Sequence, residues 1–305
     1  MSNMRVLITG GSGFIGSHLA EYLVAAGHWV VVVDNFLSGN PENLEGVSGR
    51  RLRIVRADFT RPEVLRVALK DVDVVIHEAA VTGLDACLAW PSLARHVNIK
   101  GTERLLAESL RAGVGRVVFA SSAAVYGEQE KLPISEDAVL HPLSLYGETK
   151  LEGERLCQEY FKRGLQTVCL RYFNVYGPRQ NPAYAGVILK FLRCLKEGGR
   201  PVIYGDGSQT RDFIHVSDVV RATVLALQKD CAGEAINVGT GVPTSVSQLL
   251  QTICELAGKR MRPRRLPPRA NEIKHSQADV TKAERVLGFK ASIPLEDGLR
   301  ALIGG

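Results

Sequence analysis

The sequence has few aromatic residues and no long hydrophobic run. Phe, Trp and Tyr make up 6% of the 305 residues, so we expect a core built from aliphatic side chains. No stretch approaches the roughly 18 consecutive apolar residues of a membrane-spanning helix, and the N-terminus leads directly into a strand pattern without signal-peptide features. The sequence therefore predicts a cytoplasmic protein with no membrane partner.

Paired cysteines are also absent. Six cysteines are scattered along the chain without a C-x-x-C motif, and the seven histidines show no paired ligand spacing. These spacings suit neither a zinc site nor a disulfide framework. We expect the cysteines to be small buried residues in a reducing cytoplasm, and we expect no metal ion.

The charge excess is small. Lys and Arg total 38 against 32 for Asp and Glu, which gives a net charge of +6. This excess is far below that of a dedicated nucleic-acid binder, so we expect no nucleic-acid partner. One exception is the basic stretch, residues 259–269, where six of eleven positions are Lys or Arg. A solvated basic loop is the favoured interpretation, and a nucleic-acid-associated protein is the alternative.

Strand and helix patterns alternate through the first half of the chain. β-Branched or apolar runs at residues 6–8, 30–33, 72–76, 116–120 and 167–171 predict strands, and helical patterns separate them, including residues 92–112 and 146–163. This alternation predicts an α/β fold, a doubly wound parallel sheet of the Rossmann type. We expect it to span residues 1–172. A smaller α/β lobe follows at 173–305, from which some C-terminal segments return to the first domain.

A glycine-rich turn joins the first predicted strand to the first predicted helix. Gly10, Gly13 and Gly16 leave room for a pyrophosphate at a helix N-terminus, where free N–H groups favour anions. Asp34 ends the second strand, where a carboxylate accepts hydrogen bonds from ribose hydroxyls and repels a 2′-phosphate. The pattern therefore predicts NAD in preference to NADP. Asp58, after the third strand, is a weaker candidate for contacting the adenine amino group.

Tyr146 and Lys150 stand one helical turn apart. A tyrosine acts as a base only when positive charge stabilises its phenolate, and Lys150 can supply that charge. Ser122 ends an upstream strand, at the sheet edge that faces the ligand in doubly wound folds. It is a candidate for binding a substrate hydroxyl and relaying its proton.

Together, residues 9–16, 121–127, the pair Tyr146 and Lys150, and residues 171–179 resemble the extended short-chain dehydrogenase/reductase family. Within it they resemble the NAD-dependent nucleotide-sugar epimerases, especially the UDP-glucose and UDP-N-acetylglucosamine 4-epimerases. The resemblance implies tightly bound NAD, a UDP-sugar substrate in the C-terminal lobe, and a homodimer through helices at about 92–112 and 146–163.

The resemblance also implies the roles of individual residues. The catalytic residues are Ser122, Tyr146 and Lys150. The cofactor-binding residues are Gly10, Gly13, Phe14, Ile15, Gly16, Asp34, Asn35, Ser38, Gly39, Asp58, Phe59, Ala79, Ala80, Asn98, Tyr146, Lys150 and Tyr172. The substrate-binding residues are Ser122, Tyr146, Asn174, Val187, Tyr204, Arg211, Arg269 and Ser276.

Two places in the sequence narrow the range of possible reactions. Related 4,6-dehydratases carry an acidic pair where this chain has Ala123 and Ala124, so dehydration is disfavoured and a 4-epimerase is favoured. Ser276 stands where epimerases restricted to glucose and galactose carry a bulky Tyr, which leaves room for a 2-acetamido group. The segment that contains Arg269 and Ser276 departs from the family pattern at residues 270–271, where this chain has Ala-Asn in place of Pro-Gly. A UDP-uronate epimerase or decarboxylase, and a non-catalytic NAD-binding regulator, remain alternatives.

Overall fold

A seven-stranded parallel sheet forms the centre of the protein. The computed structural model describes residues 3–47, 49–182, 186–269 and 273–304. The strands lie in the order β10-β6-β5-β4-β1-β2-β3, with neighbours running parallel. Their bounds are β1 (Arg5–Thr9), β2 (Trp29–Asp34), β3 (Leu52–Arg56), β4 (Val74–His77), β5 (Arg116–Ser122), β6 (Gln166–Tyr172) and β10 (Ala235–Val238). Because β1 lies between β2 and β4, the chain winds outward from it in both directions.

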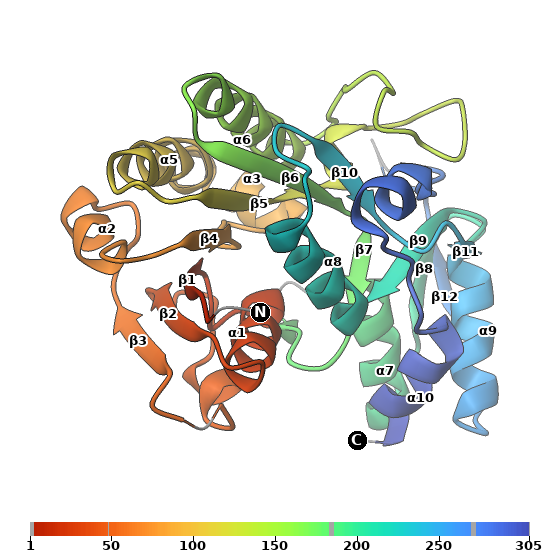
Figure 1. The fold of residues 1–305 in the computed structure, drawn as a ribbon. Helices are drawn as coiled ribbons and strands as arrows, with labels where there is room; N and C mark the ends of the chain where they lie inside the picture. Colours follow the sequence, from red (N-terminus) through yellow and green to blue (C-terminus); the bar gives the residue numbers. More distant parts are fainter. Residues whose placement is uncertain (1–2, 48, 183–185, 270–272, 305) are drawn as a thin grey trace.

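Helices cover both faces of this sheet (Figure 1). The helices α1 (Phe14–Ala25) and α8 (Val216–Gln228) pack on one face, and α2 (Pro62–Ala68), α5 (Thr102–Arg111) and α6 (Leu145–Lys162) pack on the other. Successive strand residues alternate between the two layers: Val6 and Ile8 join one core cluster and Leu7 the other. A strand buried on both faces needs a continuous aliphatic run. The predicted doubly wound α/β fold is confirmed.

The predicted helix over residues 92–112 differs from the expected regular one. It consists of α4 (Pro91–Arg95), a wider π-helical turn η2 (His96–Gly101) and α5, preceded by α3 (Leu84–Ala89). The Asn98 side chain binds both backbone groups of Val81. The Thr102 hydroxyl donates to the carbonyl of Asn98. The widened turn thereby ties this helical segment to the loop after β4.

The second lobe is built on short strands. Strands β7 (Asn174–Tyr176), β9 (Thr210–His215) and β11 (Pro243–Ser245) form one small sheet, and β8 (Val202–Tyr204) pairs with β12 (Arg264–Leu266). The helices α7 (Val187–Glu197), α9 (Val246–Leu256) and α10 (Leu295–Gly304) pack around them. A separate apolar cluster, which includes Tyr176, Phe191 and Leu249, forms the core of this lobe.

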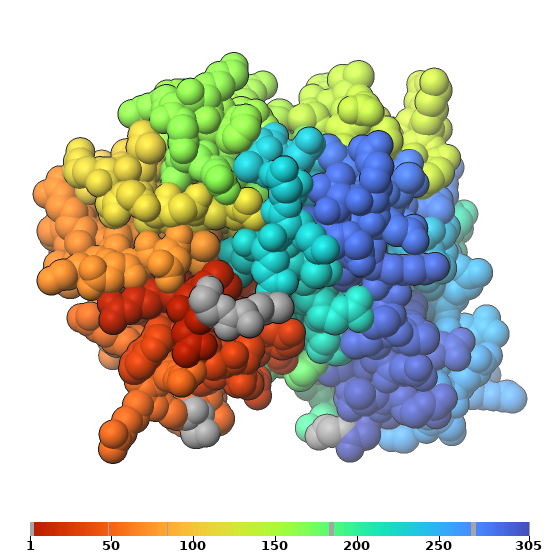
Figure 2. All heavy atoms as spheres, in the orientation of Figure 1, coloured from red at the N-terminus to blue at the C-terminus, as the bar shows by residue number. Residues whose placement is uncertain are grey.

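The chain also has three short helices among the described residues, η1 (Pro41–Leu44), η3 (Ala123–Val125) and η5 (Ala283–Leu287), and Leu44, Ala283 and Leu287 join the core cluster beside α1 and α8. The C-terminal half also contributes to the large sheet, because α8 packs beside α1 and β10 pairs with β6. Figure 2 shows the early and late parts of the chain as adjoining halves with the α8 region between them. The two lobes therefore share a packed boundary.

Candidate active site

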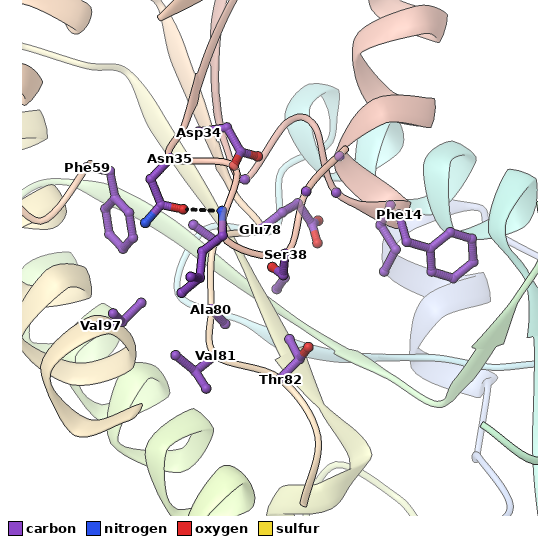
Figure 3. Close-up of a pocket in the computed structure, with 18 of the residues that line it drawn as sticks. Phe14, Asp34, Asn35, Ser38, Phe59, Glu78, Ala80, Val81, Thr82 and Val97 are labelled. Carbon is purple, nitrogen blue, oxygen red and sulfur yellow. Dashed lines mark hydrogen bonds between the residues drawn. The ribbon is translucent and has the colours of Figure 1, made fainter. Parts of the chain in front are cut away.

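A cavity of about 310 Å³ lies at the carboxyl ends of β1, β2, β4 and β5. Ligand crevices of doubly wound sheets form at this edge, beside the strand where the winding reverses. Figure 3 shows Asp34, Glu78 and Ser38 around the cavity, with Phe59 and Val97 on one side. The loops that follow the central strands therefore supply the walls.

The glycine turn brings the backbone unusually close to the next loop. Gly10 has a φ of +70°, and a Cβ atom there would lie 2.7 Å from the backbone nitrogen of Ala79. A Cβ on Gly16 would strike the carbonyl oxygen of Gly10. Gly13 caps α1 without a side-chain hydrogen bond, which leaves the N–H groups of the first turn available. This bare, positively polarised helix end fits the pyrophosphate of a dinucleotide.

Asp34 is held in one orientation at the end of β2. Its carboxylate accepts hydrogen bonds from the backbone N–H groups of Ser12 (2.9 Å) and Phe36 (2.8 Å). Gly39 lies so close that a Cβ atom would be 2.9 Å from Asp34 Oδ2. The neighbouring Asn35 accepts from the N–H of Leu37, the dashed line in Figure 3. Since a carboxylate has about four acceptor positions, Asp34 can still accept from ribose hydroxyls.

The predicted Tyr, Lys and Ser come together across α6 and β5. Lys150 is buried, donates to the carbonyl oxygen of Ala120 at 2.6 Å, and lies 5.8 Å from the centre of the Tyr146 ring. Burial lowers the pKa of Lys150 to about 8, and the negative charge of Glu78 opposes this. Burial also raises the pKa of Tyr146, whereas its hydrogen bond with Ser122 lowers it. The ammonium group therefore stands beside the ring that would become a phenolate.

Most predicted cofactor residues line this cavity. They are Gly10, Gly13, Phe14, Ile15, Gly16, Asp34, Asn35, Ser38, Gly39, Phe59, Ala79, Ala80, Tyr146, Lys150 and Tyr172. Asp58 and Asn98 do not line it. Asp58 accepts from the N–H of Thr60 at 2.9 Å, and Asn98 binds the backbone of Val81 and the hydroxyl of Thr149. Both side chains hold the loops that form the walls.

The predicted substrate residues other than Ser122 and Tyr146 belong to the second lobe. Asn174 on β7 pairs with β9, the strand that carries Arg211. The Arg269 guanidinium lies 4.0 Å from the ring centre of Tyr204, at the end of β8. The N–H of Ser276 donates to Thr210, next to Arg211.

Val187 begins α7 and packs against the core of the second lobe. None of the six second-lobe residues predicted to bind substrate lines the described cavity. Residues 183–185 and 270–272 lie outside the described part of the chain, and so does the departure from the family pattern at Ala270 and Asn271.

Several wall residues were not predicted, and Glu78 stands out among them. It follows β4 directly and lines the cavity together with Tyr146 and Lys150. Burial raises the pKa of Glu78 to about 7, and Lys150 opposes this rise. Its position after a buried strand, at the carboxyl edge of the sheet, is the signal in the sequence that could have identified it.

His77, next to Glu78, is held between two threonine hydroxyl groups. Its Nδ1 lies 2.6 Å from the Thr9 hydroxyl and its Nε2 lies 2.9 Å from the Thr102 hydroxyl. Burial lowers the pKa of His77 to about 3, so the ring is neutral at physiological pH. Among the described residues, no group of three or more His, Cys, Asp or Glu side chains is placed to hold a metal ion.

The basic stretch is exposed along most of its described length. It includes β12, and Arg200 donates to the carbonyl groups of Arg262 and Pro263. None of the helices within the described residues has both the length and the apolar character required to span a bilayer.

Known proteins match the chain over nearly its whole length. The model of the NAD dependent epimerase/dehydratase family matches residues 6–239. A UDP-glucose 4-epimerase of Mycolicibacterium smegmatis is 38% identical over 303 residues, which cover 97% of this chain and 96% of that protein.

Two solved structures extend the comparison. A UDP-N-acetylglucosamine 4-epimerase from Methanobrevibacter ruminantium, in complex with UDP-N-acetylmuramic acid, is 35% identical with a TM-score of 0.95, and the match covers 100% of this chain and 98% of that one. A UDP-glucuronic acid 4-epimerase from Bacillus cereus, in complex with UDP-glucuronic acid and NAD, is 35% identical with a TM-score of 0.92 and coverage of 99% and 98%.

Proposed function

Because the chain belongs to the NAD-dependent epimerase/dehydratase family, we propose that it is an NAD-dependent 4-epimerase of UDP-hexoses. Its substrates are UDP-N-acetylglucosamine and UDP-N-acetylgalactosamine, together with UDP-glucose and UDP-galactose. One observation carries this proposal: the Tyr146 side chain lies beside Lys150 and forms a hydrogen bond with Ser122, at the cavity that the glycine turn also lines. Each of these three groups has a task in the reversible oxidation of a secondary alcohol.

The cofactor site is assigned to the first domain, residues 1–172. The Gly10–Gly13–Gly16 turn and the start of α1 hold the pyrophosphate, and Asp34 accepts from the adenosine ribose. When bound, NAD supplies the acceptor and donor of hydride at C4 of the sugar. Asp34 selects against a 2′-phosphate because two negative charges would meet in a partly desolvated place.

Tyr146 acts as the base. Its phenolate oxygen takes the C4 hydroxyl proton, directly or through Ser122, and the hydrogen bond from Ser122 already favours this ionised form. Lys150 stabilises the phenolate, because its ammonium group lies beside the Tyr146 ring and is fixed by Ala120. The same groups return the proton after the 4-keto sugar has rotated.

Residues 173–305 are assigned to the nucleotide sugar. Arg211, Arg269 and Asn174 bind the diphosphate, for which the planar guanidinium groups are suited. Tyr204 stacks on the uracil ring, and its contact with Arg269 puts the aromatic ring and a cation in one place. Ser276 leaves space beside C2 of the sugar. Strong nucleotide contacts with loose sugar contacts permit the 4-keto sugar to rotate between the two hydride transfers.

Other reactions of the family fit the residues less well. Dehydration requires an acid and a base at C5 and C6, and Ala123 and Ala124 supply neither. Two alternatives have support among the relatives: a UDP-uronate epimerase, through the Bacillus cereus enzyme, and a UDP-uronate decarboxylase, through a relative named UDP-N-acetyl-alpha-D-glucosaminuronate decarboxylase. A non-catalytic NAD-binding regulator has no use for Ser122, Tyr146 and Lys150 held together.

We also propose a homodimer in the cytoplasm. Leu88 and Trp90, at and just after the end of α3, are 73% and 65% exposed, and Phe161 on α6 is 39% exposed. A second copy packing its α5 and α6 helices against the same elements would shield apolar residues of this kind. All six cysteines are free thiols, which suits a reducing compartment. Light scattering should give twice the mass of one 33.2 kDa chain.

The direct test is incubation of the purified protein with separate UDP-sugars and chromatographic separation of the products. We expect UDP-N-acetylglucosamine and UDP-glucose each to form a C4 epimer without a net change in NAD. Conversion of UDP-glucuronic acid alone would favour the uronate alternative, and release of carbon dioxide from it would indicate a decarboxylase. If no UDP-sugar reacts while NAD remains bound, the regulator alternative is correct.

A further inference from the structure

Glu78 puts a carboxylate where the proposed cofactor role does not need one. It lines the cavity (Figure 3), as Tyr146 and Lys150 do, and its backbone lies close to Gly10 of the turn that is assigned to a doubly charged pyrophosphate. A negative charge in that place opposes anion binding. Its presence therefore calls for a different partner within the cavity.

A chain of hydroxyl groups fixes the Glu78 carboxylate. The Tyr172 hydroxyl donates to Glu78 Oε1 at 3.1 Å and lies 2.9 Å from the Thr223 hydroxyl, which in turn lies 2.9 Å from the carbonyl oxygen of Val219. Tyr172 ends β6 and pairs in register with Ser122 on β5. The chain thus runs from α8 through the sheet to the edge that carries the proposed catalytic residues.

Both charge states of Glu78 are satisfied by this chain. When the carboxylate is ionised, Thr223 donates to Tyr172 and Tyr172 donates to Glu78. When it is protonated, Glu78 donates to Tyr172, Tyr172 to Thr223, and Thr223 to the carbonyl of Val219. Because no polar group loses its partner in either state, the structure tolerates a charge change at this position.

Lys150 is the cation that acts on Glu78, and both residues line the cavity. Four acidic groups act on Lys150: Glu78, Glu154 and the thiols Cys87 and Cys157. The Glu154 carboxylate is paired with Arg171 at 2.7 Å, and a thiol carries little charge at neutral pH. Neutral His77 also faces Lys150. Glu78 is therefore the main source of unpaired negative charge acting on Lys150 among these groups.

We propose that Glu78 is a positioning residue that holds Lys150 in its charged form beside Tyr146, with Tyr172 and Thr223 fixing the carboxylate. The inference rests on the proposed roles of Tyr146 and Lys150. The Glu78 carboxylate itself neither gives nor takes the proton that moves between the substrate and Tyr146. Its negative charge acts on Lys150, which it keeps protonated, and it also acts directly on Tyr146.

The sign of the effect is the same on both catalytic groups. The negative charge of Glu78 raises the pKa of Lys150, which stands at about 8, and raises the pKa of Tyr146. Removing this charge lowers both pKa values. The two limbs of the pH profile, which report these two groups, should therefore both move to lower pH.

The first experiment compares Glu78→Gln with the wild-type enzyme, both loaded with NAD. We expect the pH profile of kcat/KM to move toward acid by about one pH unit, a typical effect of one nearby charge. The matched control is Glu136→Gln. Glu136 is another partly buried carboxylate, which accepts from the N–H of Asn237, and it is not among the groups that act on Lys150. Its profile should stay in place. A purely structural role for Glu78 would lower the rate without moving the profile.

A second measurement does not need turnover. The ultraviolet absorbance of ionised tyrosine is titrated in the NAD-loaded protein, and the Tyr146→Phe spectrum is subtracted, in both the wild-type and the Glu78→Gln backgrounds. Tyr146 should ionise at lower pH when Glu78 is replaced by Gln, and equal titrations would overturn the proposal. If Tyr146→Phe keeps full activity, the base assignment fails independently of this result.

A third variant covers the case in which Glu78→Gln does not fold. Thr223→Val preserves volume and removes the far end of the hydroxyl chain, outside the cavity. We expect a tyrosine titration shift in the same direction but smaller, because the carboxylate stays and only its anchoring weakens. No shift, or a shift to higher pH, would contradict the proposed chain.

Discussion

The two halves of the proposed site are built in different ways. The cofactor half is made of backbone in close contact, with Gly10 against Ala79 and Gly39 against Asp34. Its buried charged side chains, such as Asp34 and Lys150, are hydrogen-bonded. The nucleotide-sugar half presents longer side chains from short strands and a loop, such as the exposed Arg269 over Tyr204.

The difference matches what each half has to hold. A tightly held dinucleotide needs a preformed surface, because ordering a binding site after association costs free energy. A sugar that must rotate during the reaction needs anchoring only at its nucleotide. We therefore expect substitutions in the first half to affect folding and cofactor together, and substitutions in the second half to affect substrate affinity alone.

The largest expected effect comes from Tyr146→Phe, at the junction of the two halves. It removes only the oxygen that, as a phenolate, takes the proton, so turnover should fall by about 10³-fold, as is typical for loss of a general acid–base group. Bound NAD, measured by absorbance after denaturation, and UDP binding, measured by calorimetry, should be unchanged. Retained turnover would refute the base assignment.

The second prediction tests the close contacts of the cofactor half. Gly10→Ala forces a residue with a Cβ atom into a positive φ and against Ala79. We expect a loss of about 2–4 kcal/mol in unfolding free energy, together with loss of bound NAD. The matched control is Gly46→Ala, whose Cβ would meet nothing within 4 Å. Denaturant unfolding should give a lower unfolding free energy for Gly10→Ala than for Gly46→Ala. Equal values would contradict the interpretation that the glycine turn is rigid and closely packed.

The predicted site residues that the structure brings together at the cavity include those whose placement depends on local spacing. The glycine turn and the Tyr146–Lys150 pair need only one strand–turn–helix unit or one helical turn. The seven-stranded sheet follows from aliphatic runs alternating with helices. Asp58 shows the limit of this reasoning, because an acid after a strand either reaches a ligand or binds its own loop. Here it accepts from the N–H of Thr60.

The position of Glu78 after a buried strand marks it in the sequence, but the sequence does not indicate its partners. Its environment depends on Tyr172, which is 94 positions away in sequence, and on Thr223 of α8. Only the folded sheet brings β4, β6 and α8 together. The wide turn over residues 96–101 is similar: it depends on the contact between Asn98 and Val81, which no helical periodicity indicates.

The third prediction concerns the nucleotide-sugar half. Arg269→Ala should raise the KM for UDP-sugars by about 10–100-fold, because a charged hydrogen bond to phosphate contributes about 1.5–3 kcal/mol. Bound NAD and thermal stability should not change. Arg260→Ala removes an exposed arginine of the same basic stretch and should leave KM unaltered. Equal effects of the two variants would mean that Arg269 acts only through the general charge of that stretch.

The smallest expected effect returns to the cofactor half and concerns pH. His77 is kept neutral, with its pKa lowered from 6.5 to about 3, so the unfolded chain binds its proton more readily than the native protein does. Stability from this group is complete above pH 6.5 and is lost as the pH falls toward 3. Between pH 7.5 and 6 the loss should be about 1 kcal/mol. Burial also lowers the pKa of His18, His28 and His215, so the wild-type protein should lose more than this.

The variant His77→Gln tests this contribution. It keeps a polar group near Thr9 and Thr102 and removes only the contribution of His77, so its stability to denaturant should vary less with pH than that of the wild type. Identical pH dependence would mean that the Thr9–His77–Thr102 contacts accommodate a charged ring.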